Sequence, residues 1–122
     1  MTRIVCVAIG LLLLATVSRA ESVIKGLGAM PCGDLANEYR RNRSIENDML
    51  LWAQGFWSGA NAVVFQNDKT YRDLDALTAE DEKQSLFIYC DAHPLALFEV
   101  AVMDVYNSKF PLKRYSPASS SR

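Results

Sequence analysis

One long stretch of helical periodicity constrains the fold of this chain more than any other feature. Between Ile45 and Gln66, apolar residues recur at intervals of three and four, the spacing of one helix face. At about 100° per residue, the apolar arc also takes in Leu50 and Trp57, which makes it unusually wide. The recurring positions are Ile45, Met49, Trp52, Ala53, Phe56, Ala60, Val63 and Val64. We therefore expect this helix to be covered on more than one side, with Trp52 and Phe56 in the core.

Two glycines, Gly55 and Gly59, lie one turn apart at the edge of this arc. Each costs about 1 kcal/mol relative to alanine inside a helix. We expect the compensation to be the close approach of another helix, so both are candidate helix-packing residues. Contact with a ligand is the alternative.

The first twenty residues have the pattern of an export signal. Arg3 supplies a positive charge, residues 4–17 are apolar, and Ser18-Arg19-Ala20 places small residues where signal peptidases require them. The apolar run is shorter than the ~20 residues that span a bilayer, which makes a retained membrane anchor the weaker interpretation. We expect residues 1–20 to be a signal peptide that is cleaved between Ala20 and Glu21.

Cleavage would leave two cysteines, Cys32 and Cys90, in 102 residues, a length that suits one domain with one core. In an oxidising compartment we expect the two thiols to form a disulfide. Such a bridge closes a long loop and, in the chain-entropy treatment, stabilises the fold by roughly 4 kcal/mol. Two free, buried thiols are the alternative.

Two shorter helices are predicted on either side of the long one. Asp34 can cap a helix from Leu35 to about Arg41, and Ser44 can cap the long helix. Thr78 can cap a further helix that runs to about Ala92. The first turn of that helix holds three carboxylates, which the helix dipole favours. Its inner side is predicted to be Leu86, Phe87, Tyr89 and Cys90.

The last predicted helix, about Leu95 to Asn107, carries two apolar groups. One stripe is expected to face the core: Leu95, Phe98, Val102, Val105 and Tyr106. The second group is Leu97, Val100 and Met103, which points elsewhere and exceeds what the core of a small monomer needs. We therefore treat it as a candidate client or dimer surface. The alternative is that both groups belong to the core.

The predicted fold class is all-α, a small bundle of three to four helices held by one disulfide. Strand signals are weak throughout the chain. Residues 21–30 are expected to be a flexible arm, and residues 31–109 the helical domain. Residues 110–122 are rich in proline and serine, so we expect a flexible C-terminal tail without core residues.

The predicted mature chain offers little for catalysis. Its 11 basic and 14 acidic side chains give a net charge of −3, which does not favour nucleic-acid binding. His93 is the single histidine, and Cys90, three residues before it, is better used in the disulfide. A hydrolase and a metal site are therefore both weakly supported. We expect no enzymatic activity, no cofactor and no metal.

Acid is expected to loosen the domain. With every carboxyl group protonated and His93 charged, the side chains of the mature chain carry about +12. Protonation would also remove the stabilisation that Glu80, Asp81 and Glu82 give to the start of their helix. The disulfide would survive and limit how far the chain expands.

Two motifs resemble those of the HdeA/HdeB family of periplasmic acid-stress chaperones. Residues 30–35 read Met-Pro-Cys-Gly-Asp-Leu, and residues 89–94 read Tyr-Cys-Asp-Ala-His-Pro where the family has Tyr-Cys-x-x-Asn-Pro. A tryptophan-bearing helix and a Thr-x-x-Asp helix start lie between them. The resemblance covers about residues 30–107. It implies a small helical fold, a bridge between Cys32 and Cys90, and a periplasmic location.

The resemblance leads to two functional expectations. The first is an HdeA/HdeB-like holdase that binds unfolding clients at low pH and forms a homodimer. The second is an immunity or inhibitor protein, because residues 55–61, His93-Pro94 and Lys109-Phe110-Pro111 are similar, more weakly, to Rap/Tai immunity proteins. Those proteins neutralise secreted enzymes that cleave peptidoglycan; Leu112 stands where they usually have cysteine. Either role implies protein partners, with no nucleic acid and no membrane after signal removal.

Overall fold

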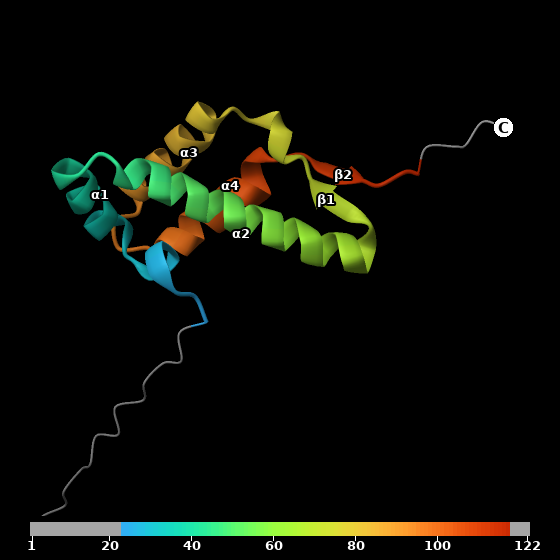
Figure 1. Cartoon of the computed structure of the whole chain (residues 1–122), viewed down its shortest axis with the longest axis horizontal. Coiled ribbons are helices and arrows are strands. Elements are labelled where there is room, and N and C mark those ends of the chain that lie inside the picture. The colour runs from blue at the N-terminus through green and yellow to red at the C-terminus, as the bar shows by residue number, and fades with distance from the viewer. Residues whose placement is uncertain (1–22, 118–122) are drawn as a thin grey trace, which may run out of the picture.

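Helix α2 (Ile45–Asp68) is the longest element, and the other helices and the small sheet lie along its length (Figure 1). The computed structural model describes residues 23–117, so the predicted cleavage site at Ala20 and Glu21 lies outside the described residues. Within that range the chain forms four α-helices, two 3₁₀ turns and one two-stranded sheet. The other elements are η1 (Gly26–Ala29), α1 (Cys32–Arg41), β1 (Thr70–Arg72), η2 (Leu74–Ala76), α3 (Ala79–Ala92), α4 (Phe98–Lys109) and β2 (Leu112–Arg114). The predicted all-α bundle is confirmed.

A disulfide between Cys32 and Cys90 joins the first residue of α1 to the end of α3, as predicted. The two Cα atoms are 5.0 Å apart, and both cysteines are buried. Packing of Tyr39 against Phe87, with ring centroids 5.2 Å apart, adds a second contact between these helices. The short helix α1 is therefore held to α3 at both of its ends.

Trp57, rather than Trp52 or Phe56, is the central residue of the core. Its side chain is fully buried, its Nε1–H donates a 2.8 Å hydrogen bond to the carbonyl oxygen of Val102, and its ring meets Phe110 edge to face. Trp52 and Phe56, predicted to be core residues, are only half-buried and stack on each other at its margin. Helix α4 covers α2 on the side of Trp57, so the buried face is rotated away from the centre of the apolar arc.

A small sheet at the far end of α2 contradicts the expectation of a structureless tail (Figure 1). β1 and β2 pair antiparallel, with Tyr71 opposite Lys113. Phe110, assigned to the tail by its sequence, is buried against Trp57. Asn61 connects this end to α2, since its amide exchanges two 2.8 Å hydrogen bonds with the backbone of Arg72. The tail prediction missed this pairing because a three-residue strand leaves almost no periodic signal.

The expected flexible arm also contains packed structure. Gly26–Ala29 forms the 3₁₀ turn η1, and Met30 accepts a 2.9 Å hydrogen bond from the backbone N–H of Phe98. Gly28 is buried so closely against Trp52 that an added Cβ would lie 2.2 Å from its ring. Glycine at this position therefore lets the N-terminal segment lie flat on the indole.

Helix starts agree with the predictions only in part. Thr78 caps α3 as expected, and a reciprocal capping box with Asp81 is present. Ser44 makes no side-chain cap, because its N–H and hydroxyl both donate to the side-chain oxygen of Asn42. Helix α1 begins at Cys32, so Asp34 lies in its first turn instead of capping it.

The two glycines of α2 do not pack against another helix, contrary to the prediction. Both Gly55 and Gly59 are exposed, and an added Cβ at either would meet nothing within 4 Å. The buried face of α2 runs through Ala53 and Trp57 instead.

Substituting Gly55 with alanine is therefore expected to stabilise the protein by about 1 kcal/mol, because it removes a helix-propensity cost without a clash. Urea denaturation followed by circular dichroism measures this change. The matched control is Gly28→Ala, which should destabilise because its Cβ overlaps Trp52. A loss of stability in Gly55→Ala would show that another helix does cover this face.

Candidate functional site

The turn between α3 and α4 is fixed to the start of α1 by backbone hydrogen bonds. The N–H groups of Cys32 and Gly33 donate to the carbonyl oxygens of Ala96 and Pro94, each at 2.8 Å. The hydrogen bond from the N–H of Phe98 to the carbonyl oxygen of Met30 continues the pairing two residues further on. With the adjacent disulfide, these contacts hold residues 94–98 in place and set where α4 begins.

Four large apolar side chains on this turn and on α4 are exposed to solvent. Leu97, Val100 and Met103 are 38%, 41% and 48% exposed, and they follow one another at intervals of three along the helix. Leu95, assigned to the core stripe by sequence, is 92% exposed because α4 begins three residues later than predicted. We call Leu95, Leu97, Val100 and Met103 the α4 apolar surface.

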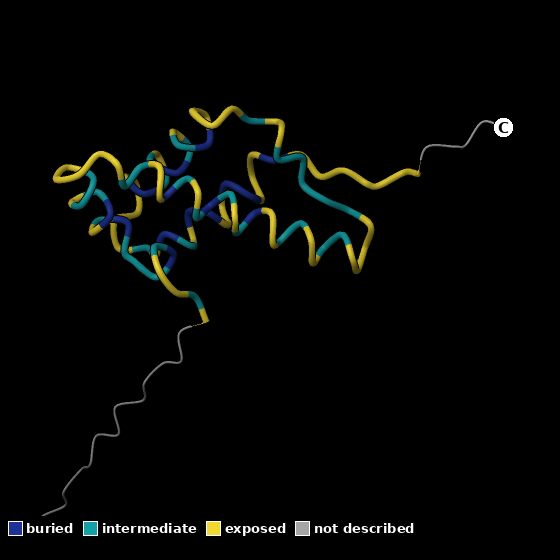
Figure 2. Tube along the Cα trace, viewed as in Figure 1, coloured by how far each residue is buried: buried dark blue, intermediate teal, exposed yellow. Residues whose placement is uncertain are grey.

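The opposite face of α4 forms the core, which explains why both apolar groups are present in one helix. Phe98, Ala101, Val102 and Val105 are buried. Along the backbone, buried positions lie toward the inside of the helical bundle and exposed positions toward its outside (Figure 2). The alternative that both groups are core residues is therefore wrong for Val100 and Met103. Exposed apolar side chains of this size are a feature of binding surfaces when they gather on one element.

A shallow groove of about 280 Å³ lies between α3 and α4, and Ile88 and His93 line it. The His93 ring stacks on Tyr89 with centroids 4.3 Å apart, and its Nδ1 lies 3.0 Å from the Tyr89 carbonyl oxygen, to which it donates. Cys90 is bonded to Cys32, so neither of the two cysteines among residues 23–117 has a thiol to pair with this imidazole. Within residues 23–117, no cluster of three or more His, Cys, Asp and Glu side chains is placed to hold a metal ion.

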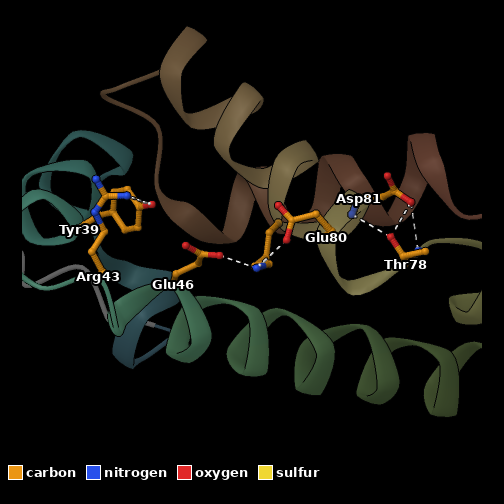
Figure 3. A network of polar contacts seen from close by, with 7 residues as sticks. Tyr39, Arg43, Glu46, Thr78, Glu80 and Asp81 are labelled. Carbon is orange, nitrogen blue, oxygen red and sulfur yellow. Dashed lines mark hydrogen bonds and ion pairs between the residues drawn. The ribbon is translucent and has the colours of Figure 1, made fainter.

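Two ion pairs link elements that the disulfide does not join to each other. Lys83 of α3 binds Glu46 of α2 at 2.5 Å and Glu80 at 2.8 Å (Figure 3). Lys113 of β2 binds Asp73, next to β1, at 2.5 Å. The hydrogen bond from each lysine is the main reason that the pKa values of Glu46 and Asp73 lie below their ordinary values of 4.5 and 3.8.

The pKa of Glu82 is shifted in the opposite direction from those of Glu46 and Asp73. The expectation that all three acidic residues at the start of α3 stabilise the helix is therefore wrong for Glu82. Its side chain is buried, and burial raises the pKa of its carboxyl group above 4.5, although a hydrogen bond from Gln54 opposes the shift. Sequence reasoning missed this residue. The signal was its spacing, since Glu82, Leu86 and Cys90 are separated by four residues and are the buried positions of α3.

Comparison with known proteins identifies no relative. The chain matches no model of a protein family, no curated protein and no solved structure. Within the part of the chain that the structure describes, no helix has both the length and the apolar character needed to cross a bilayer.

Proposed function

We propose that this protein is an exported, HdeA/HdeB-like holdase that binds unfolding proteins in acid through the α4 apolar surface. The observation that carries the proposal is the exposure of four large apolar side chains on a turn and helix held by the disulfide and by backbone hydrogen bonds. Because a surface of this kind binds other apolar chains without any catalytic group, the proposal is for a binding protein, not an enzyme.

The ion pairs supply the acid response of the proposal. Because the folded-state pKa values of Glu46 and Asp73 are lowered, their stabilisation is present above about pH 4.5 and is lost as pH falls through the folded values. Loss of the Glu46–Lys83 pair would loosen α2 from α3, and loss of Asp73–Lys113 would loosen the small sheet. The accumulating positive charge would then favour opening.

Glu82 has the opposite effect on the pH dependence of stability at pH values above its ordinary pKa. Its folded-state pKa is raised, so its ionised form destabilises the fold at neutral pH, and this cost disappears as pH falls toward 4.5. In the proposal, the fold therefore opens only when the paired carboxylates themselves begin to protonate.

Two substitutions with opposite effects test this pH dependence. Glu46→Gln should lower the free energy of unfolding near pH 7, and its difference from wild type should vanish as pH falls well below 4.5. Glu82→Gln should raise the free energy of unfolding near pH 7, and its difference should also vanish below 4.5. Urea titrations at several pH values measure both. A change of the same sign in the free energy of unfolding of both variants would contradict the opposite roles of Glu46 and Glu82.

The function itself is tested with a client protein that aggregates at about pH 3, in the range where carboxylates titrate. Adding an equimolar amount of the oxidised, processed protein should suppress light scattering at that pH and not at pH 7. The double variant Val100→Ser/Met103→Ser should lose most of the protection. The control is Leu51→Ser/Val63→Ser, which removes two exposed apolar side chains from α2 instead. Unchanged scattering with the wild-type protein would leave the holdase proposal without support.

One observation favours a second candidate, an immunity-type inhibitor of a secreted cell-wall-degrading enzyme. The α4 apolar surface is already formed and fixed in the folded protein, as a dedicated partner would require. This candidate predicts tight binding of one folded partner at neutral pH, whereas the proposed holdase binds clients that unfold in acid. A single partner co-purifying with the exported protein at pH 7, and lost in Val100→Ser/Met103→Ser, would place it first.

A further inference from the structure

A solvent-open pocket of about 430 Å³ lies away from the α4 apolar surface, between the middle of α2, the turn η2 and the start of α3. Its volume is within the range of small-ligand sites. Trp57 and Leu74 are among its apolar lining residues, and Gln54, Ser58, Asp75 and Glu82 bring polar groups to it. The polar residues come from α2 and, later in the sequence, from the adjacent elements η2 and α3.

Glu82 is the unusual residue of this pocket, because it is a carboxylate with 5% of its surface exposed and no cationic partner in the described chain. Its one hydrogen bond comes from Nε2 of Gln54, at 2.8 Å. The adjacent Lys83 turns instead to Glu46 and Glu80. Burying a carboxylate with a single neutral partner is costly, and a cation in the pocket would offset that cost.

The side chains around the pocket offer more free hydrogen-bond acceptors than free hydrogen-bond donors. Nε2 of Gln54 is engaged with Glu82, the Ser58 hydroxyl donates to the carbonyl oxygen of Gln54, and the Trp57 indole N–H donates to Val102. Asp75 adds a second carboxylate at the rim. A ligand that fits this lining must bring hydrogen-bond donors and a positive charge.

We propose that this pocket binds an alkylguanidinium or alkylammonium group, with the Glu82 carboxylate as its charge partner and Asp75 at the entrance. A bare metal ion is the weaker candidate, because no cluster of three or more His, Cys, Asp and Glu is placed to hold one among residues 23–117. The volume also exceeds what a single ion needs. The group comes either from a free small amine or from an arginine or lysine side chain of a partner polypeptide.

The test is an NMR titration of the ¹⁵N-labelled, oxidised protein at pH 7, observing the Trp57 indole N–H and the Gln54 side-chain amide. The probes are ethylguanidinium, blocked arginine (acetyl-Arg-N-methylamide) and the neutral isostere, blocked citrulline. Saturable shifts with both guanidinium probes are expected, with roughly tenfold or weaker binding of citrulline. If blocked arginine binds more tightly than ethylguanidinium, the natural ligand is assigned as a side chain of a partner polypeptide. If the two probes bind equally, it is assigned as a free small molecule.

The Glu82→Gln variant should bind blocked arginine at least roughly tenfold more weakly than wild type. The matched control Glu80→Gln, which neutralises an exposed carboxylate of the same helix turn, should bind normally. The comparison of arginine with citrulline uses the wild-type chain, so it does not depend on either variant folding. Shifts that stay linear to the solubility limit, or equal binding of arginine and citrulline, would overturn the proposal.

Discussion

Replacing Trp57 with alanine is expected to lower the free energy of unfolding by about 3–5 kcal/mol, the range for large aromatic truncations in cores. The indole is fully buried, its N–H bonds the Val102 carbonyl oxygen of α4, and its ring packs on Phe110 before the small sheet. Alanine would leave a cavity where three elements meet and would remove the indole hydrogen bond that joins α2 to α4. Urea denaturation followed by circular dichroism measures the loss.

Trp52→Ala is the matched control for this experiment, because it removes the same side chain from the same helix. Trp52 is only half-buried and lies among Gly28, Phe56 and Phe98 at the edge of the core. We expect it to cost roughly half as much, about 1.5–3 kcal/mol, the range for losing the burial of one large apolar side chain. A larger loss for Trp52→Ala than for Trp57→Ala would contradict the central role of Trp57.

Removal of the disulfide has the second large expected effect. The Cys32→Ser/Cys90→Ser variant should lose about 4 kcal/mol of stability, because the bridge closes a loop across a sequence separation of 58 residues. The stability that remains in this variant should be lowest in acid, where the Glu46–Lys83 pair no longer ties α2 to α3. Thermal unfolding of oxidised and variant protein at pH 7 and at about pH 3 measures this difference.

Mass spectrometry of the exported protein provides the control for that experiment. It should find an N-terminus at Glu21 and a mass two hydrogens below that of the reduced chain. A thiol reagent that modifies Cys32 or Cys90 in the native, exported protein would contradict the bridge as the physiological state. Wild-type stability of the double-serine variant would show that packing of α1 on α3 suffices without it.

The sequence by itself determined the helical class, the disulfide and the location of the longest helix. These features are carried by local patterns: a wide apolar repeat over residues 45–66, the Thr78 capping box, and two cysteines left for one bridge. Each of these patterns is defined by the spacing of residues along the chain, so it can be read from the sequence alone. The exposed positions Leu97, Val100 and Met103 were also recognisable, because a helix with two apolar faces can bury only one of them in a small bundle.

Only the tertiary structure decided which face of α2 is buried, because an arc that wide leaves the rotation of the helix open. The position of α4 fixed that rotation at Trp57 and left Gly55 and Gly59 exposed. The pairing of β1 with β2 joins residues about 40 positions apart, and Phe110 packs on Trp57, which is further away still. Local propensity carries no information over such separations. Glu82 illustrates the same limit: its sequence context is that of a helix-start carboxylate, but its burial comes from the packing of α3 against α2. Burial depends on what lies across the interface, and that is a property of the assembled fold.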